Sequence, residues 1–190
     1  MKVLFPILIL FLLTSCAAKY GIVAGAQMPS YEEEATVNDI LNGTSTTLPR
    51  FKNNGVGFHI GISEETDLLL SKITYFSNSY DKKSYTFEAV TEDYSIEESG
   101  IEISTAIKLW WFQPLLGVKF YNSEYTGETN SNEGSYAAFL IGLDFEVPIS
   151  DRFYVYTGYH YETGYKTNIT TEVDYYHYNY VLGLRYNFSK

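Results

Sequence analysis

The chain closes with the stretch YYHYNYVLGLRYNFSK, residues 175–190, in which two kinds of side chain alternate. Counting back from Phe188, every second residue as far as Tyr176 is apolar or aromatic, whereas the residues between them are mostly polar or small. Successive side chains of a β-strand point to opposite faces, so this period of two predicts a long strand with one apolar face. That face must lie against either a protein core or lipid.

Seven other segments show a similar alternation, and no long segment shows the roughly 3.6-residue period of an amphipathic helix. Most of them reach or exceed the roughly 9–11 residues that a tilted strand needs to cross a bilayer. The chain is therefore expected to be all-β, with about eight strands in one domain of ordinary size. The expected strands are residues 20–27, 55–63, 67–76, 96–111, 115–125, 135–147, 152–163 and 175–188.

The connections between these strands alternate in length. Short connections on one side and long ones on the other are typical of transmembrane β-barrels, whereas a soluble sandwich has no reason to sort its loops in this way. Much of the acidic charge lies in the long connections, a pattern that solvation of exposed loops also explains. Tight turns are expected at 64–66, 112–114 and 148–151, and long polar loops at 28–54, 77–95, 126–134 and 164–174.

The two faces of the strands decide which solvent the barrel meets. With its apolar face inward, the barrel would show water a thin surface of glycines, tyrosines and few charges. With its apolar face outward, it would have a lipid-facing band and a narrow interior filled by glycines and charges. We expect the second arrangement, with the buried charges paired because unpaired ones are costly. The expected lumen residues are Lys108, Lys119, Arg185, Glu102, Asp144, Glu146 and Glu162.

Segment 67–76 is the weak case, because its two faces are nearly equal in polarity. Leu70 and Phe76 share a face with Lys72. Lys72 is therefore expected in the lumen network only if this strand follows the pattern of the others.

The composition supports a membrane setting. Tyrosine occurs 19 times and aromatic residues make up 17% of the chain, and tyrosine favours both strands and membrane–water boundaries. Aromatic residues gather around Trp110 and Trp111 near a tight turn and around Tyr161 and Tyr175 near the long loops, which predicts two aromatic girdles. The net charge of −10 argues against a nucleic-acid partner, because phosphate binding needs a cationic surface.

Residues 1–18 have the pattern of a signal peptide. The apolar run of residues 3–13 is too short for a membrane-spanning helix. The LTSC that ends at Cys16 looks like a lipobox, in which Cys16 would be lipidated and become the mature N-terminus. Ordinary cleavage after Ala17 or Ala18 is the alternative. Because Cys16 is the single cysteine, no internal disulfide is expected.

Three features resemble the small outer-membrane β-barrel family, of which the OmpA transmembrane domain and OmpX are members. They are the opening YGIVAGAQ of residues 20–27, the closing YVLGLRYNF of residues 180–188 and the alternation of turns and loops between them. The resemblance implies an eight-stranded antiparallel up-and-down transmembrane β-barrel, within residues 19–190, in the outer membrane of a Gram-negative-type bacterium. It also implies that Phe188 is the signal recognised by barrel-insertion machinery, although two residues follow it here.

The resemblance further implies a structural or surface-interaction role, such as envelope integrity or adhesion, for a monomer whose lumen is plugged by polar side chains. The expected partners are outer-membrane lipids, the barrel-insertion machinery and an extracellular surface ligand, and no cofactor is expected. One alternative is a lipid-anchored periplasmic barrel of lipocalin-like type, which would bind a small apolar ligand in an apolar lumen. A narrow gated pore and a lipid-modifying barrel enzyme are further alternatives.

The three histidines, His59, His160 and His177, fall on the polar faces of three different strands. They could in principle meet around zinc, but their spacing matches no ligand motif. His160 and Glu162 share one face in GYHYE, and a hydrolase would need such a pair beside a nucleophile. Two inward residues on one strand are unremarkable, so we expect neither a metal site nor a catalytic site.

Overall fold

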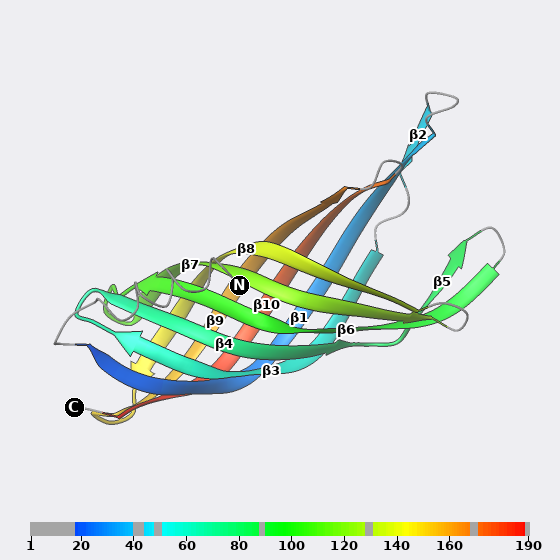
Figure 1. Cartoon of the computed structure of the whole chain (residues 1–190). Helices are drawn as coiled ribbons and strands as arrows, with labels where there is room; N and C mark the ends of the chain where they lie inside the picture. The colour runs from blue at the N-terminus through cyan, green and yellow to red at the C-terminus, as the bar shows by residue number, and fades with distance from the viewer. Residues whose placement is uncertain are drawn as a thin grey trace.

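The computed structural model describes residues 18–39, 44–47, 51–87, 90–127, 131–167 and 171–188 (Figure 1). Within these ranges, no helix is long and apolar enough to cross a membrane. The regular structure there is β-strand, which agrees with the expected class. The strands are β1 (Lys19–Asp39), β2 (Thr44–Thr47), β3 (Phe51–Glu65), β4 (Leu69–Tyr80), β5 (Lys83–Phe87), β6 (Val90–Ile107), β7 (Phe112–Gly127), β8 (Ser131–Pro148), β9 (Phe153–Thr167) and β10 (Thr171–Asn187).

Eight of the described strands form a closed antiparallel barrel. Starting from β1, the strands β3, β4, β6, β7, β8, β9 and β10 each pair with the one before, and β10 pairs back with β1. This closing seam runs from the pair Gly21–Asn187 to the pair Val37–Thr171. The short strands β2 and β5 pair with β1 and β6. The predicted eight-stranded up-and-down barrel is therefore confirmed.

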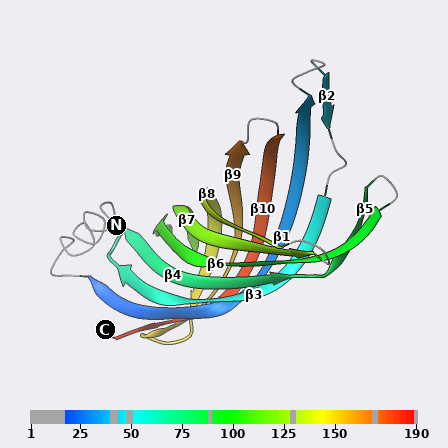
Figure 2. The same cartoon turned by 45° about the vertical axis from the view of Figure 1, so that its right-hand side comes forward.

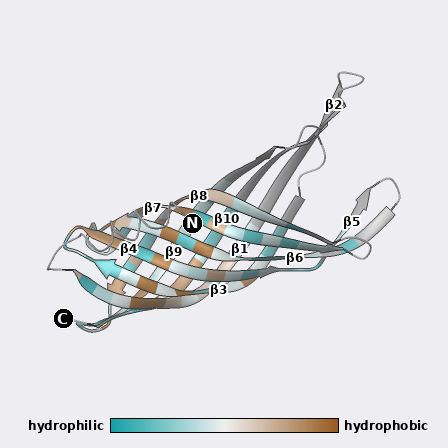
Figure 3. Ribbon diagram, viewed as in Figure 1, coloured by the Kyte–Doolittle hydropathy of each residue, from teal (hydrophilic) through white to brown (hydrophobic). Residues whose placement is uncertain are grey.

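The outer surface of the barrel carries the apolar residues, as predicted from the alternation. Along the barrel strands, hydrophobic and hydrophilic residues follow one another (Figure 3). Val56, Leu116 and Phe139 are 70%, 65% and 73% exposed, and every barrel strand contributes exposed large apolar side chains. Soluble proteins rarely expose contiguous apolar patches of this extent. A closed barrel with such a band is suited to lipid, where every backbone group must be paired internally.

Some hydroxyl groups on the outer face of the barrel form hydrogen bonds with neighbouring strands. Ser71 Oγ on β4 and Thr105 Oγ1 on β6 lie 3.1 Å apart. Thr157 Oγ1 on β9 donates to the carbonyl oxygen of Val181 at 3.0 Å. Since hydrocarbon offers no hydrogen bonds, this pairing lowers the cost of placing hydroxyl groups on the outer face.

The two ends of the barrel differ (Figure 2). At one end, which we call the turn end, short connections join β3 to β4, β6 to β7 and β8 to β9. Phe188 N donates to the carbonyl oxygen of Tyr20 there at 2.8 Å. At the opposite loop end the strands are longer than predicted, since β1 continues to Asp39 and β6 begins at Val90. Beyond the membrane both faces of a strand meet water, so no alternation marks it in the sequence.

The turn between β6 and β7 lies at residues 108–111 and not at 112–114 as predicted. Trp110 in this turn has a φ of 66° and is 90% exposed. A left-handed conformation costs an ordinary residue roughly 1–2 kcal/mol. The ring of Trp111 stacks on Phe145 of β8, with ring centroids 5.6 Å apart. The run LWWF of residues 109–112 is apolar throughout and contains no glycine, proline or polar residue typical of a turn, so its composition did not mark a turn at this point.

Candidate functional site in the lumen

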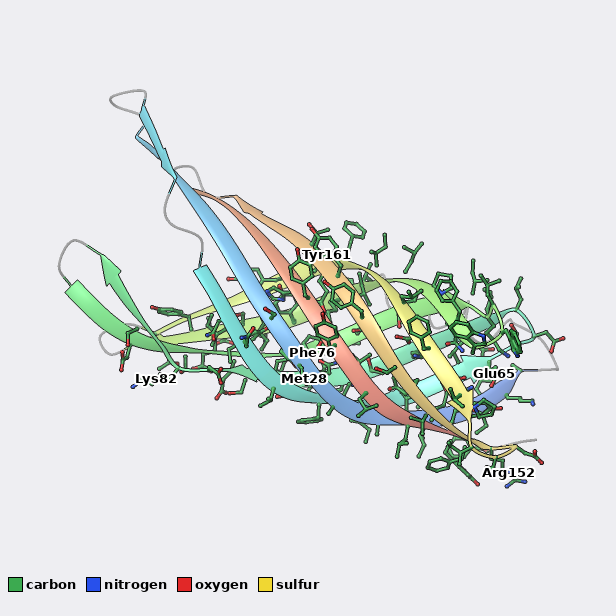
Figure 4. All side chains as sticks on the ribbon, turned by 180° about the vertical axis from the view of Figure 1, so that it is seen from behind. Met28, Glu65, Phe76, Lys82, Arg152 and Tyr161 are labelled. Carbon is green, nitrogen blue, oxygen red and sulfur yellow. The ribbon has the colours of Figure 1, made fainter. Side chains whose placement is uncertain are left out.

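The charged residues predicted for the lumen line the inside of the barrel, with one exception. Lys119, Asp144 and Arg185 are at most 2% exposed. Lys108 lies in the turn after β6 and is only partly buried, so it reaches the lumen from the turn end. Figure 4 labels Glu65 near that end and Phe76 further along the barrel. The other predicted lumen residues are also buried: Glu102, Glu146 and Glu162.

A first group, the turn-end cluster, surrounds Arg185 of β10. The guanidinium donates to Glu146 of β8 from Nε at 2.9 Å and from Nη2 at 2.6 Å. Its Nη1 donates to Glu65 of β3 at 2.6 Å. Asn187 donates to the same Glu65 carboxylate at 2.8 Å, and Lys108 forms an ion pair with it. Two cations thus meet two carboxylates, and the two-pronged contact with Glu146 is a strong form of ion pair.

A second group, the middle cluster, spans the interior. Lys72 Nζ of β4 lies 2.6 Å from Asp144 Oδ2 of β8. His160 Nε2 of β9 lies 2.8 Å from Asp144 Oδ1. Because β4 and β8 are not neighbours in the sheet, the pair of Lys72 and Asp144 ties two separate walls of the barrel. Lys72 therefore joins the network, and segment 67–76 follows the pattern of the other strands.

The inner wall also has an apolar part. Leu70 and Phe76 share the lumen face of β4 with Lys72 and are at most 1% exposed. Lys119 Nζ lies 4.2 Å from the centre of the Phe76 ring, so this aromatic face is also in contact with a cation. The apolar residues form two small clusters, Leu70 with Ala106, Leu115 and Leu140, and Phe76 with Tyr121 and Ala138.

A third group, the loop-end cluster, holds most of the remaining buried charge. Lys119 of β7 forms an ion pair with Glu162 of β9, and its Nζ lies 3.9 Å from Glu102 of β6. The ring of His177 of β10 lies between two carboxylates. Its Nδ1 is 3.7 Å from Glu162, and its Nε2 is 3.8 Å from Glu98 of β6. This cluster again links strands on different sides of the lumen.

Glycines on the inner face make room for these side chains. A methyl group added at Gly158 would lie 2.0 Å from Asp144 Oδ1. One added at Gly183 would lie 2.5 Å from the ring of Tyr156. Both separations are far below van der Waals contact, so the side chains of neighbouring strands lie directly over these glycines. The glycines predicted to relieve crowding inside the barrel do so here.

The Gly158→Ala substitution is expected to lower the free energy of unfolding by about 1–3 kcal/mol, because the new methyl group must displace the Asp144 carboxylate from His160 and Lys72. Urea unfolding in lipid vesicles measures the change. Ala137→Val, which enlarges an exposed outward residue of β8, serves as the control and should change stability little. Equal stability of both variants would show that free space exists beside Asp144.

No family model matches the sequence, and no curated protein matches it. Similar solved structures include neisserial surface protein A (13% identity, 87% of this chain and 99% of that chain, TM-score 0.47) and Ail, the attachment invasion locus protein of Yersinia pestis (13%, 87% and 98%, 0.43). Another is the outer membrane protease OmpT of Escherichia coli (8%, 92% and 98%, 0.47). At these identities and TM-scores the likeness carries no argument about function.

The closed strand order, the outward apolar band and the buried charges decide the architecture. This chain has the fold of the small outer-membrane β-barrels. The resemblance inferred from the sequence is confirmed at the level of the fold. A barrel of this kind is stable where its band meets hydrocarbon, so this fold is suited to a membrane.

Each of the three histidines of this barrel contacts other polar residues. His160 pairs with Asp144, not with Glu162, its neighbour in the predicted hydrolase pair. His59 Nε2 contacts the hydroxyl of Tyr156, and His177 lies between its two carboxylates. In the part of the chain that the structure describes, no group of three or more histidine, cysteine or acidic residues is placed to hold a metal ion.

Several lumen residues of the barrel were missing from the predicted set. Glu65 was assigned to a turn, but β3 runs through it. Glu98 has the same parity as Glu102, and Asn187 the same parity as Arg185, so extending the alternation along each strand would have found both. Residues 1–17, with Cys16, lie outside the described residues. Phe188 follows β10 directly and is 57% exposed.

Proposed function

We propose that this barrel lies in the outer membrane of a Gram-negative-type bacterium and is a monomer with a sealed lumen. We further propose that it has a structural or surface-interactive role, in envelope integrity or adhesion. The observation that carries the proposal is the presence of three charged clusters inside the barrel. Each cluster joins strands that are not neighbours in the sheet, so side chains cross the lumen at three successive depths. Buried ions held in this way are stable only while they stay paired, which favours a plug over an open channel.

The lipocalin-like alternative fits the geometry less well. Such a barrel needs an apolar lumen that accepts an apolar ligand. Here Arg185 and Asp144 are fully buried inside, while Phe139 and Ile141 are 73% and 56% exposed on the outside. The distribution of polarity is the reverse of the one that this alternative needs.

A catalytic role also fits less well. The His160–Asp144 pair is the arrangement closest to a catalytic dyad within the described lumen. However, the same carboxylate lies 2.6 Å from Lys72, and both members of the pair are buried in the network. A general base needs access to a substrate, so we infer that this pair is structural and that the chain is not an enzyme.

The loop end supports the surface-interactive part of the proposal. Glu97, Glu124 and Glu133 are exposed on β6, β7 and β8. Glu124 lies directly opposite Glu97 on one side and Glu133 on the other. Like charges in this arrangement repel and destabilise a sheet. An acidic row kept at such a cost fits a surface that serves contact with the surroundings, and we propose an extracellular ligand as its partner.

The start of β1 and the end of β10 lie together at the turn end, and the sequence next to each of them fits a role in targeting. We propose Phe188 as the insertion signal read by the barrel-insertion machinery and Cys16 as a lipidation site. A lipid on Cys16 would lie three residues before β1, close enough to enter the inner leaflet of the outer membrane. Mass spectrometry of the mature N-terminus from outer-membrane fractions separates lipidated Cys16 from cleavage after Ala17 or Ala18.

Two measurements test the proposed function. Purified wild-type barrel inserted into a planar lipid bilayer should give no discrete conductance steps, and regular steps at each insertion would contradict the sealed lumen. Cells that lack the protein should be more sensitive to detergent or adhere less to surfaces than cells that contain it. If neither property changes, the structural and surface-interactive role is wrong.

A further inference from the structure

Charge balance separates the loop-end cluster from the other two. In the turn-end cluster two cations meet two carboxylates, and in the middle cluster one cation meets one carboxylate. The loop-end cluster holds three buried carboxylates, Glu98, Glu102 and Glu162. Among the described residues, Lys119 is the one lysine or arginine that an ion pair joins to this cluster. A buried carboxylate without a cation is costly, so this depth of the lumen needs further positive charge.

His177 is placed to supply that charge. Its ring is 3% exposed, and its two nitrogen atoms face two different carboxylates. Nδ1 is 3.7 Å from Glu162, and Nε2 is 3.8 Å from Glu98. These distances are those of ion pairs and not of hydrogen bonds, so a neutral imidazole would leave both carboxylates without a counter-charge, whereas an imidazolium places a positive charge between them. The geometry around His177 therefore suits the protonated ring.

The other groups around the ring allow this protonated state. Tyr80 of β4 donates its hydroxyl to Glu98 at 2.8 Å, and its ring centre lies 6.3 Å from that of His177. The ring of Tyr121 of β7 lies 6.4 Å from the imidazole ring. Lys119 of β7 is the cation that would oppose protonation, but its ammonium group is already paired with Glu162. Three carboxylates against one ammonium leave the local field attractive for a second cation.

The other two histidines lack this setting. His160 faces Asp144, whose charge Lys72 already balances. His59 faces the hydroxyl of Tyr156. Either ring can form the recorded contact in its neutral form, since each contact uses only Nε2. His177 is thus the histidine whose proton the charge balance requires.

We propose that His177 is a proton-dependent strut across the loop end of the lumen. As an imidazolium it ties β10 to β9 and, across the lumen, to β6. When the proton leaves, Glu98 and Glu162 lose their shared cation and the tie is released. The tie is present below the ordinary imidazole range of about 6.5 and is lost as the pH rises well above it. This inference goes beyond the sealed lumen, because the turn-end and middle clusters hold in either state.

Amide hydrogen exchange of the barrel in lipid vesicles tests the strut. Wild type and His177→Gln are compared with each other at about pH 6 and again at about pH 9, so that the intrinsic pH dependence of exchange cancels. At the lower pH the variant should exchange on the order of tenfold faster around Glu98 and His177, because the tie holds these backbones in wild type only. At the higher pH the two proteins should exchange alike.

Two further variants make the result specific. His160→Gln removes a histidine whose contact needs no extra proton, so its effect should be the same at both pH values. The double variant Glu98→Gln with His177→Gln removes one carboxylate together with the cation, and it should exchange slowly at both pH values.

An effect of His177→Gln that is equal at the two pH values would overturn the proposal. If His177→Gln does not fold, wild type and the double variant are compared instead. Wild type should then exchange faster than the double variant at the higher pH and equally slowly at the lower pH. Equal exchange at both pH values would overturn the proposal. Conductance of the wild type would contradict the sealed lumen but not this strut.

Discussion

Replacing Arg185 with alanine is expected to lower the free energy of unfolding of the barrel by about 3–5 kcal/mol. Arg185 is fully buried, and its guanidinium donates to Glu65 and Glu146 on two other strands. Without it Glu146 keeps only Gln113 as a donor, at 3.3 Å, among the contacts recorded for its carboxylate. Removing only the cation of a buried ion pair destabilises a protein more than replacing both partners with apolar residues, because the carboxylate is left buried without a counter-charge. Urea unfolding of wild type and variant in lipid vesicles measures the loss.

Arg152→Ala is the matched control for this loss. Arg152 lies at the same end of the barrel, in the turn before β9. Its backbone carbonyl accepts from Asn187 N, a contact that alanine keeps, and its side chain is not one of the cations paired with Glu65 or Glu146. Its replacement should change stability by less than about 1 kcal/mol. In a planar bilayer the Arg185→Ala barrel should conduct no more than wild type, because the middle and loop-end clusters still cross the lumen. A variant of unchanged stability that conducts would mean that Arg185 gates a pore and does not act as a tie.

Alternation along the strands was enough to place most of the lumen residues. A membrane barrel separates two surroundings of opposite polarity, lipid outside and a polar interior. Apolar and polar residues therefore alternate along each spanning strand. Arg185, Asp144 and Glu162 were assigned to the inside on this basis. The signal failed in segment 67–76, because the lumen face of β4 is itself partly apolar. Leu70 lies there beside Lys72, so polarity could not separate the faces.

The partners of the charged residues could not be predicted, because they depend on how the barrel closes. Residues two apart on one strand point the same way, but the alternation does not show whether such a side chain meets its own strand or another one. Arg185 donates to Asn187 on its own strand, whereas His160 meets Asp144 on the neighbouring strand and not Glu162. Contacts across the lumen, such as the one between Arg185 and Glu65, depend on the stagger of all eight strands. Nothing local in the sequence encodes that stagger.

A lysine in place of Ile141, on the outer face of β8, is expected to lower the free energy of unfolding by about 2–4 kcal/mol in a bilayer. Ile141 is 56% exposed and belongs to an outward apolar series that includes Phe139 and Val147 of the same strand. In hydrocarbon the ammonium group loses its hydration and finds no counter-ion on the outer face. Urea unfolding of the folded barrel in vesicles measures this cost, and Ile141→Val should be nearly neutral by comparison.

Glu133→Lys is the control that turns this result into a test of location. Glu133 lies on the same strand and has the same outward parity as Ile141, but it lies past the apolar band at the loop end. A lysine there stays hydrated and faces Glu124, so it should not lower stability and should raise it by about 0.2–1 kcal/mol through relief of the acidic repulsion. The two substitutions place the same side chain on one face of one strand, so the difference between them reports the solvent at each depth. Equal costs would mean that water, not lipid, covers Ile141, and the barrel could not then span a membrane.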